Sequence, residues 1–133
     1  MNKEDYVSLE CAKLLKEKGF KENVFTFYEA ECAEGDFELF ESYEVEDFNA
    51  RADNFSAPTQ SIAQKWLREI KGVYVWVEPV IGKRWKVSFC DFNVPTEESD
   101  WMENEINKGN GYKVYVTYEE ALEAGLQEAL KLI

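Results

Sequence analysis

The chain has 133 residues, a formal net charge of −12, 45% hydrophobic residues and no histidine. This length and apolar content predict one globular domain over residues 1–133, with a core that needs no disulfide. The lack of histidine excludes Ser-His and Cys-His nucleophile pairs and histidine-ligated zinc sites, and no apolar run approaches the roughly 20 residues of a membrane helix.

The first predicted element is an amphipathic helix over residues 8–18. Ser8 is placed to cap it, Cys11 and Leu15 lie on its apolar stripe, and Gly19 ends it. Two extended segments follow, at residues 24–30 and 37–43, and a turn at residues 34–36 joins them.

Residues 44–56 are polar and acidic, and they predict a loop. Glu46 and Asp47 are neighbouring carboxylates in this loop. They lack the ligand spacing of an EF-hand, so we expect a solvated loop and no metal site.

A central helix is predicted over residues 59–71, behind a proline and a capping hydroxyl. Its apolar stripe is predicted to be buried around Trp66 and its polar side to face solvent. The stripe consists of Ile62, Ala63, Trp66, Leu67 and Ile70, and the polar side consists of Gln60, Ser61, Gln64, Lys65, Arg68 and Lys71.

Gly72 ends this helix, and alternating β-branched and aromatic residues then predict a hairpin with strands at residues 73–78 and 84–92. A break follows at residues 94–101, with room for one helical turn, and a turn at residues 107–111. Residues 112–116 predict a further strand. Thr117 and Glu120 form a capping box at the start of a final helix over residues 117–132.

These elements predict an α+β fold in which a mostly antiparallel sheet of four to five short strands packs against three helices. The three cysteines, Cys11, Cys32 and Cys90, are far apart in the sequence. They are interpreted as small core residues in a reducing compartment. No motif indicates a catalytic residue, a bound metal or a cofactor, so we expect a protein that is not an enzyme. Because residues 1–5 carry no apolar signal segment, we expect a cytoplasmic location.

The charge is unevenly distributed along the chain. Residues 29–57 carry ten acidic groups and one basic group, whereas residues 58–92 carry six basic groups and three acidic groups. The basic region coincides with the central helix and the hairpin. The candidate binding surface therefore combines its polar and cationic residues with two aromatic residues that share one face of a strand: Gln64, Lys65, Arg68, Lys71, Lys83, Arg84, Lys86, Tyr74 and Trp76.

Three classes of function fit these features. The first is a protein-interaction module that binds itself or another protein through the Tyr74 and Trp76 face. The second is winged-helix-like nucleic-acid binding through residues 60–71 and 83–86, which the net charge opposes; its electrostatic opposite is an acidic protein that imitates DNA and occupies a DNA-binding partner. The third is a hydrolase with paired carboxylates. No membrane partner is expected.

Three stretches carry a resemblance to a known group of proteins: residues 8–10 with 12–20, residues 57–60 with 65–69, and residues 118–125. Together they resemble small uncharacterised proteins of gut Bacteroidetes that are encoded in prophages and other mobile elements. The resemblance implies a genomic setting and carries no activity or functional residue.

Overall fold

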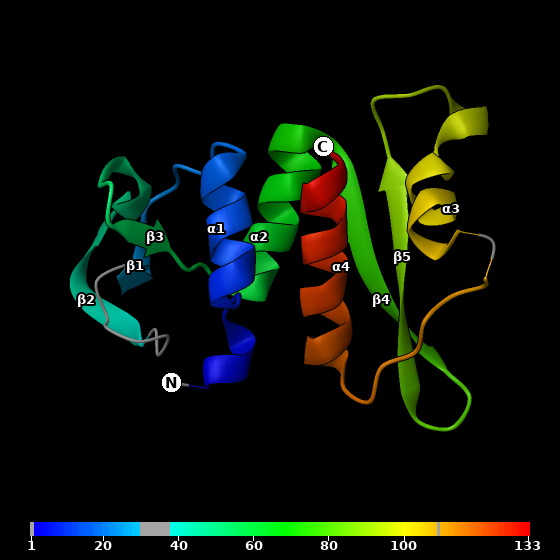
Figure 1. Ribbon diagram of the computed structural model, residues 1–133, viewed down its shortest axis with the longest axis horizontal. Coiled ribbons are helices and arrows are strands. Elements are labelled where there is room, and N and C mark those ends of the chain that lie inside the picture. The colour runs from blue at the N-terminus through cyan, green and yellow to red at the C-terminus, as the bar shows by residue number, and fades with distance from the viewer. Residues whose placement is uncertain (1, 30–37, 109) are drawn as a thin grey trace.

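The computed structural model describes residues 2–29, 38–108 and 110–133, and within these ranges the fold is α+β (Figure 1). Four α-helices and five strands form the fold, with short 3-10 turns between them. In chain order the elements are η1 (Lys3–Asp5), α1 (Leu9–Glu17), β1 (Val24–Glu29), β2 (Leu39–Glu46), η3 (Phe48–Ala50), β3 (Asn54–Ser56), α2 (Gln60–Trp66), η4 (Leu67–Lys71), β4 (Val73–Val80), β5 (Arg84–Asp91), η5 (Thr96–Glu98), α3 (Trp101–Asn107) and α4 (Tyr118–Leu132).

The C-terminal helix α4 is at the centre of the packing, with α1 and α2 on one side and the β4–β5 hairpin on the other. Leu122, Leu126 and Leu130 are buried along α4, as their helical spacing predicts. Gly125 allows the close approach to the hairpin, because a Cβ atom on this residue would lie 2.4 Å from Val87 Cγ1. The absence of a side chain at Gly125 therefore lets α4 and the hairpin pack closely.

The strands belong to two antiparallel sheets and not to one: a three-stranded sheet in the order β2-β1-β3 and the two-stranded β4–β5 hairpin. The hairpin is regular from Val73↔Asp91 to Val80↔Arg84. Its alternation places Val73 and Val75 in the core and Tyr74 and Trp76 on the opposite face. Helices α1, α2 and α4 lie between the two sheets, whereas α3 packs against β5 at the far end of the molecule, as Figure 1 shows.

The central helix begins as predicted, with the Thr59 side chain accepting a hydrogen bond from the Ile62 N–H, but its last turn is π-helical. Trp66 is buried, at 5% exposure, and its ring meets that of Phe20 edge to face. The predicted stripe was too wide, because Ile62 and Ile70 are 43% and 61% exposed. Gln60 was assigned to the wet side and is buried instead, since its amide donates to the Glu119 carbonyl oxygen at 2.9 Å.

The main differences from the sequence prediction lie in three segments. The predicted loop at 44–56 contains the end of β2, the turn η3 and the short strand β3, whose pairing with β1 is set by long-range contacts. The predicted strand at 112–116 is reduced to one bridge, in which Tyr115 pairs with Trp85. The break after β5 leads into the helix α3, which the prediction missed.

Several predictions lie partly or wholly outside the described residues. Ala30 and Phe37, at the ends of two predicted strands, the turn at 34–36 and Cys32 are among them. Cys11 is buried, as expected, and Cys90 is half-buried.

Candidate functional site

Part of the predicted binding surface is assembled around the outer face of β4. The rings of Tyr74 and Trp76 stack with centroids 4.9 Å apart, and the Arg68 guanidinium lies 5.6 Å from the Tyr74 ring centroid. Phe92, which the sequence analysis did not include, continues this aromatic row, 6.4 Å from Tyr74. Tyr74 and Trp76 are half-buried by these mutual contacts, so the face is less open than the alternation alone suggests.

Two further members of the predicted surface have structural partners. The Gln64 amide donates to the Val75 carbonyl oxygen at 2.6 Å, at the edge of β4 that faces away from β5. The Lys71 ammonium lies 5.5 Å from the Trp66 ring centroid. Lys65 is exposed on α2, beside this group.

The remaining cations lie toward the other end of the hairpin. Lys83 and Arg84 are exposed at its turn, and Lys86 lies 3.4 Å from the Glu78 carboxylate. Glu78 also accepts a 2.8 Å hydrogen bond from the Trp76 indole N–H, and that bond, with Lys86, lowers its pKa. Since β4 is 8 residues long, roughly 25 Å separates Arg68 and Lys71 from the turn. The predicted surface is therefore divided into two clusters and forms no continuous basic surface.

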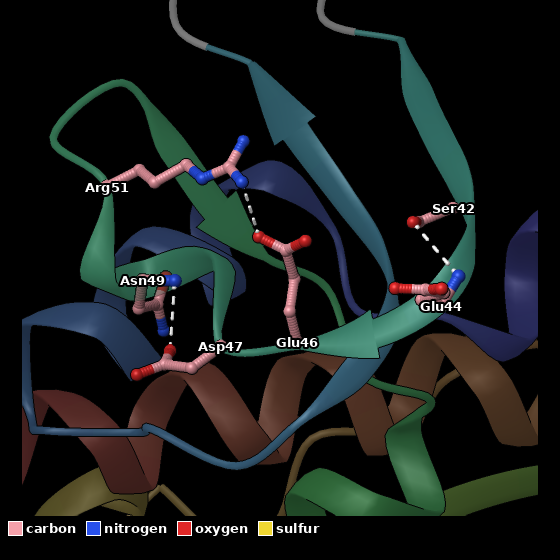
Figure 2. A network of polar contacts seen from close by, with 6 residues as sticks. All are labelled: Ser42, Glu44, Glu46, Asp47, Asn49 and Arg51. Atoms are coloured by element: carbon pink, nitrogen blue, oxygen red, sulfur yellow. Dashed lines mark hydrogen bonds and ion pairs between the residues drawn. The ribbon is translucent and has the colours of Figure 1, made fainter.

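The carboxylates of Glu46 and Asp47 are each engaged locally, as Figure 2 shows. Glu46 Oε1 lies 2.8 Å from Arg51 Nη2, and Asp47 Oδ1 accepts a 3.0 Å hydrogen bond from the Asn49 N–H at the start of η3. These contacts assign both residues to the architecture of the strand end. Among the described residues, no group of three or more acidic or cysteine side chains is arranged to hold a metal ion.

A groove of about 820 Å³ lies at the N-terminal ends of α1, α2 and α4. Helices α1 and α4 pack against each other, and the chain enters both of them at the same end of the molecule (Figure 1). Four apolar or aromatic side chains line this groove: Tyr6, Leu9, Tyr28 and Val116. Five carboxylates and one cation also line the groove. The carboxylates are Glu4, Glu10, Glu119, Glu120 and Glu123, and the cation is Lys3.

The groove carboxylates differ in their surroundings. Glu123 is fixed, because its Oε1 accepts from the Ser8 N–H at 2.9 Å and its Oε2 accepts from the Ser8 hydroxyl at 2.8 Å and from the Gln127 amide at 2.6 Å. The other four side chains form no salt bridge with any described residue. Glu10, Glu119 and Glu120 occupy first helical turns, where the helix dipole favours negative charge.

Two titratable groups near Glu123, namely Tyr28 and Cys11, are held in their neutral forms. Burial raises the pKa of Tyr28 to about 12, with smaller contributions from Glu123 and Cys11, and its hydroxyl donates to the Val7 carbonyl oxygen at 2.8 Å. Burial, and then Glu123, raise the pKa of the Cys11 thiol well above its usual value. Cys11 is therefore a structural thiol, because a nucleophilic cysteine needs a lowered pKa.

The groove could not be predicted from the sequence. Its residues come from the chain start, the central helix and the last helix, and the separate capping signals at Ser8, Thr59 and Thr117 give no indication that the three helix starts lie together. Only the concentration of acidic residues in first turns was visible in the sequence.

Comparisons with known proteins return no relative: no protein-family model matches the chain, and no curated protein or solved structure is significantly similar. The resemblance to gut Bacteroidetes proteins stays a prediction. Within the described residues, no helix has both the length and the apolar character that a membrane crossing requires.

Proposed function

We propose that this chain is a non-enzymatic protein-interaction module, and that its groove binds a segment of a partner protein in which an apolar residue is flanked by cations. The observation that carries the proposal is the groove itself. Glu4, Glu10, Glu119 and Glu120 converge on one hollow of about 820 Å³ that also presents apolar side chains.

The electrostatics support a cationic ligand. Stabilisation by a helix dipole accounts for each first-turn carboxylate on its own helix, but it does not account for their convergence on a shared concave surface. A concave site with one sign of charge concentrates the electric field and attracts the opposite charge. The net charge of −12 reinforces this attraction over the whole surface.

The apolar lining supports a peptide in preference to a simple cation. Leu9, Tyr6 and Val116 give an apolar side chain a place to be removed from water, which contributes about 25 cal/mol per Å² of buried apolar area. The nucleic-acid alternative gains less support, because the basic residues are divided between the two ends of β4 and most of the surface charge is negative.

A short fluorescein-labelled peptide of alternating leucine and lysine tests the proposal by fluorescence anisotropy. We expect saturable binding that weakens with salt, and no binding of the matched leucine–glutamate peptide. Replacing both Glu119 and Glu120 with Gln should weaken binding about 2- to 30-fold, since exposed charge contacts contribute about 0.2–1 kcal/mol each.

The matched control carries Glu97→Gln and Glu98→Gln, which change the net charge equally in the exposed turn η5, outside the groove. If binding weakens equally in both double variants, the loss comes from the change in overall charge. That result would contradict a binding site in the groove.

A further inference from the structure

The turn of the β4–β5 hairpin carries the kind of side chains proposed to bind in the groove, namely an apolar residue next to cations. Ile81 at this turn is fully exposed, and Lys83 and Arg84 beside it are exposed as well. Neither cation forms a salt bridge with any described residue. The turn therefore presents an exposed isoleucine beside two cations that pair with no described carboxylate, and Arg84 donates only to the Gly82 carbonyl oxygen at 3.3 Å.

The turn is also held in a defined shape. Gly82 and Lys83 have φ values of 86° and 57°, and Val80 pairs with Arg84 directly below them. Left-handed residues at a hairpin turn fix its backbone geometry, so the apolar and cationic side chains project from fixed backbone positions. Such preorganisation lowers the entropy cost of binding.

We infer that the groove of one molecule receives the hairpin turn of a second copy of this chain, with Ile81 among the apolar lining residues and Lys83 and Arg84 facing the carboxylates. The inference rests on the proposed function of the groove and names its occupant. Charge complementarity carries it: four carboxylates without a described salt-bridge partner, at Glu4, Glu10, Glu119 and Glu120, face two cations without one.

The positions of the two surfaces favour a closed pair. In Figure 1 the hairpin turn and the N-terminal ends of α1 and α4 are at the same end of the molecule. A two-fold axis at that end lets each turn enter the groove of the other copy, which is the isologous arrangement of most homodimers. The net charge of −12 on each copy opposes association at long range, but physiological salt screens charges beyond about 8 Å and leaves the close contacts in place.

Sedimentation equilibrium at physiological ionic strength tests the inference with two charge-reversal variants. One carries Lys83→Glu and Arg84→Glu, and the other carries Glu119→Lys and Glu120→Lys. We expect the wild-type protein to shift toward twice its mass of 15.5 kDa as concentration rises, and each variant alone to remain monomeric.

An equimolar mixture of the two variants should dimerise again, because each mismatched surface then meets its opposite charge. Circular dichroism confirms that each variant folds. Ile81→Ser should also abolish the dimer without changing the charge, whereas the matched control Tyr43→Ser, at another fully exposed position, should leave it intact.

A monomeric wild-type protein, a dimer that survives either reversal, or a mixture that stays monomeric would overturn the inference. The leucine–lysine peptide separates this failure from that of the groove: peptide binding by a monomeric protein leaves the proposed function standing with a different partner. If the peptide also fails to bind, the groove is not a binding site.

Discussion

Glu123 of α4 caps the first turn of α1 by accepting hydrogen bonds from both the backbone N–H and the hydroxyl of Ser8, at 2.9 and 2.8 Å. The two residues are 115 positions apart in the sequence. Ser8 also accepts a bond from the Cys11 N–H, so it serves as the local cap of its own helix while it joins that helix to the last one. This contact fixes the relative position of α1 and α4 and therefore the width of the groove between their starts.

We expect Glu123→Ala to lower the free energy of unfolding by about 1–3 kcal/mol, because it removes a charged acceptor and leaves the Ser8 N–H without its partner. Urea denaturation of Glu123→Ala, Ser8→Ala and the double variant measures the coupling between the two residues. The double variant should lose less stability than the sum of the single losses. Glu105→Ala, on the exposed side of α3, is the control; strict additivity at Ser8 and Glu123 would contradict the linking role.

Gly125 is the point of closest contact between α4 and the hairpin. In an exposed helix, replacing glycine with alanine raises the free energy of unfolding by about 1 kcal/mol. Here the added Cβ would lie 2.4 Å from Val87 Cγ1 and 3.0 Å from Val75 Cγ1, so we expect Gly125→Ala to destabilise by about 1–3 kcal/mol. Thermal unfolding shows whether Gly125→Ala lowers the melting temperature, as we expect, or raises it.

The double variant Gly125→Ala with Val87→Ala identifies the cause. Since Val87→Ala removes the nearer clashing atom, Gly125→Ala should cost clearly less in that background than in the wild type. An equal cost in both backgrounds would show that the contact with Val87 is not responsible.

Tyr28 gives the fold an alkaline limit. Its pKa is about 12 in the folded state, against 10.0 for a free tyrosine, so the folded protein holds its proton more tightly than the unfolded chain. The resulting stabilisation is complete below pH 10 and is lost as the pH rises toward 12, by at most about 3 kcal/mol for a pKa raised from 10.0 to about 12.

We therefore expect stability to fall between pH 10 and 12 more steeply in the wild type than in Tyr28→Phe, measured by urea denaturation across that range. Tyr28→Phe should itself be less stable at neutral pH, because the Val7 carbonyl oxygen loses its hydrogen bond. Tyr43→Phe, which alters a fully exposed ring, should follow the wild-type curve; parallel curves for wild type and Tyr28→Phe would contradict the shift.

Local signals made α1, α2, α4 and the hairpin predictable. The hydroxyl caps at Ser8, Thr59 and Thr117 all accept the expected backbone hydrogen bonds, and the alternation from Val73 onward places the valines in the core. Trp66 is buried as predicted, and the strand β4, which follows the central helix, is extended as predicted.

The failures have a common physical cause, which is that long-range contacts override local preference. β3 is only 3 residues long and exists because it pairs with β1. Residues 112–116 alternate like a strand, but they meet β5 only at the bridge between Tyr115 and Trp85. The groove depends on how the starts of three helices are placed in the tertiary structure. Composition and periodicity carry no information about that placement.

The site of peptide binding is the most direct test of the groove. Amide chemical shifts of the ¹⁵N-labelled protein, followed during titration with the leucine–lysine peptide, report which surface the peptide contacts. We predict that the largest shifts occur at Ser8, Glu10 and the residues from Val116 to Glu120. Shifts centred on Arg68, Tyr74 and Trp76, or no saturable shifts at all, would contradict the assignment of the groove as the binding site.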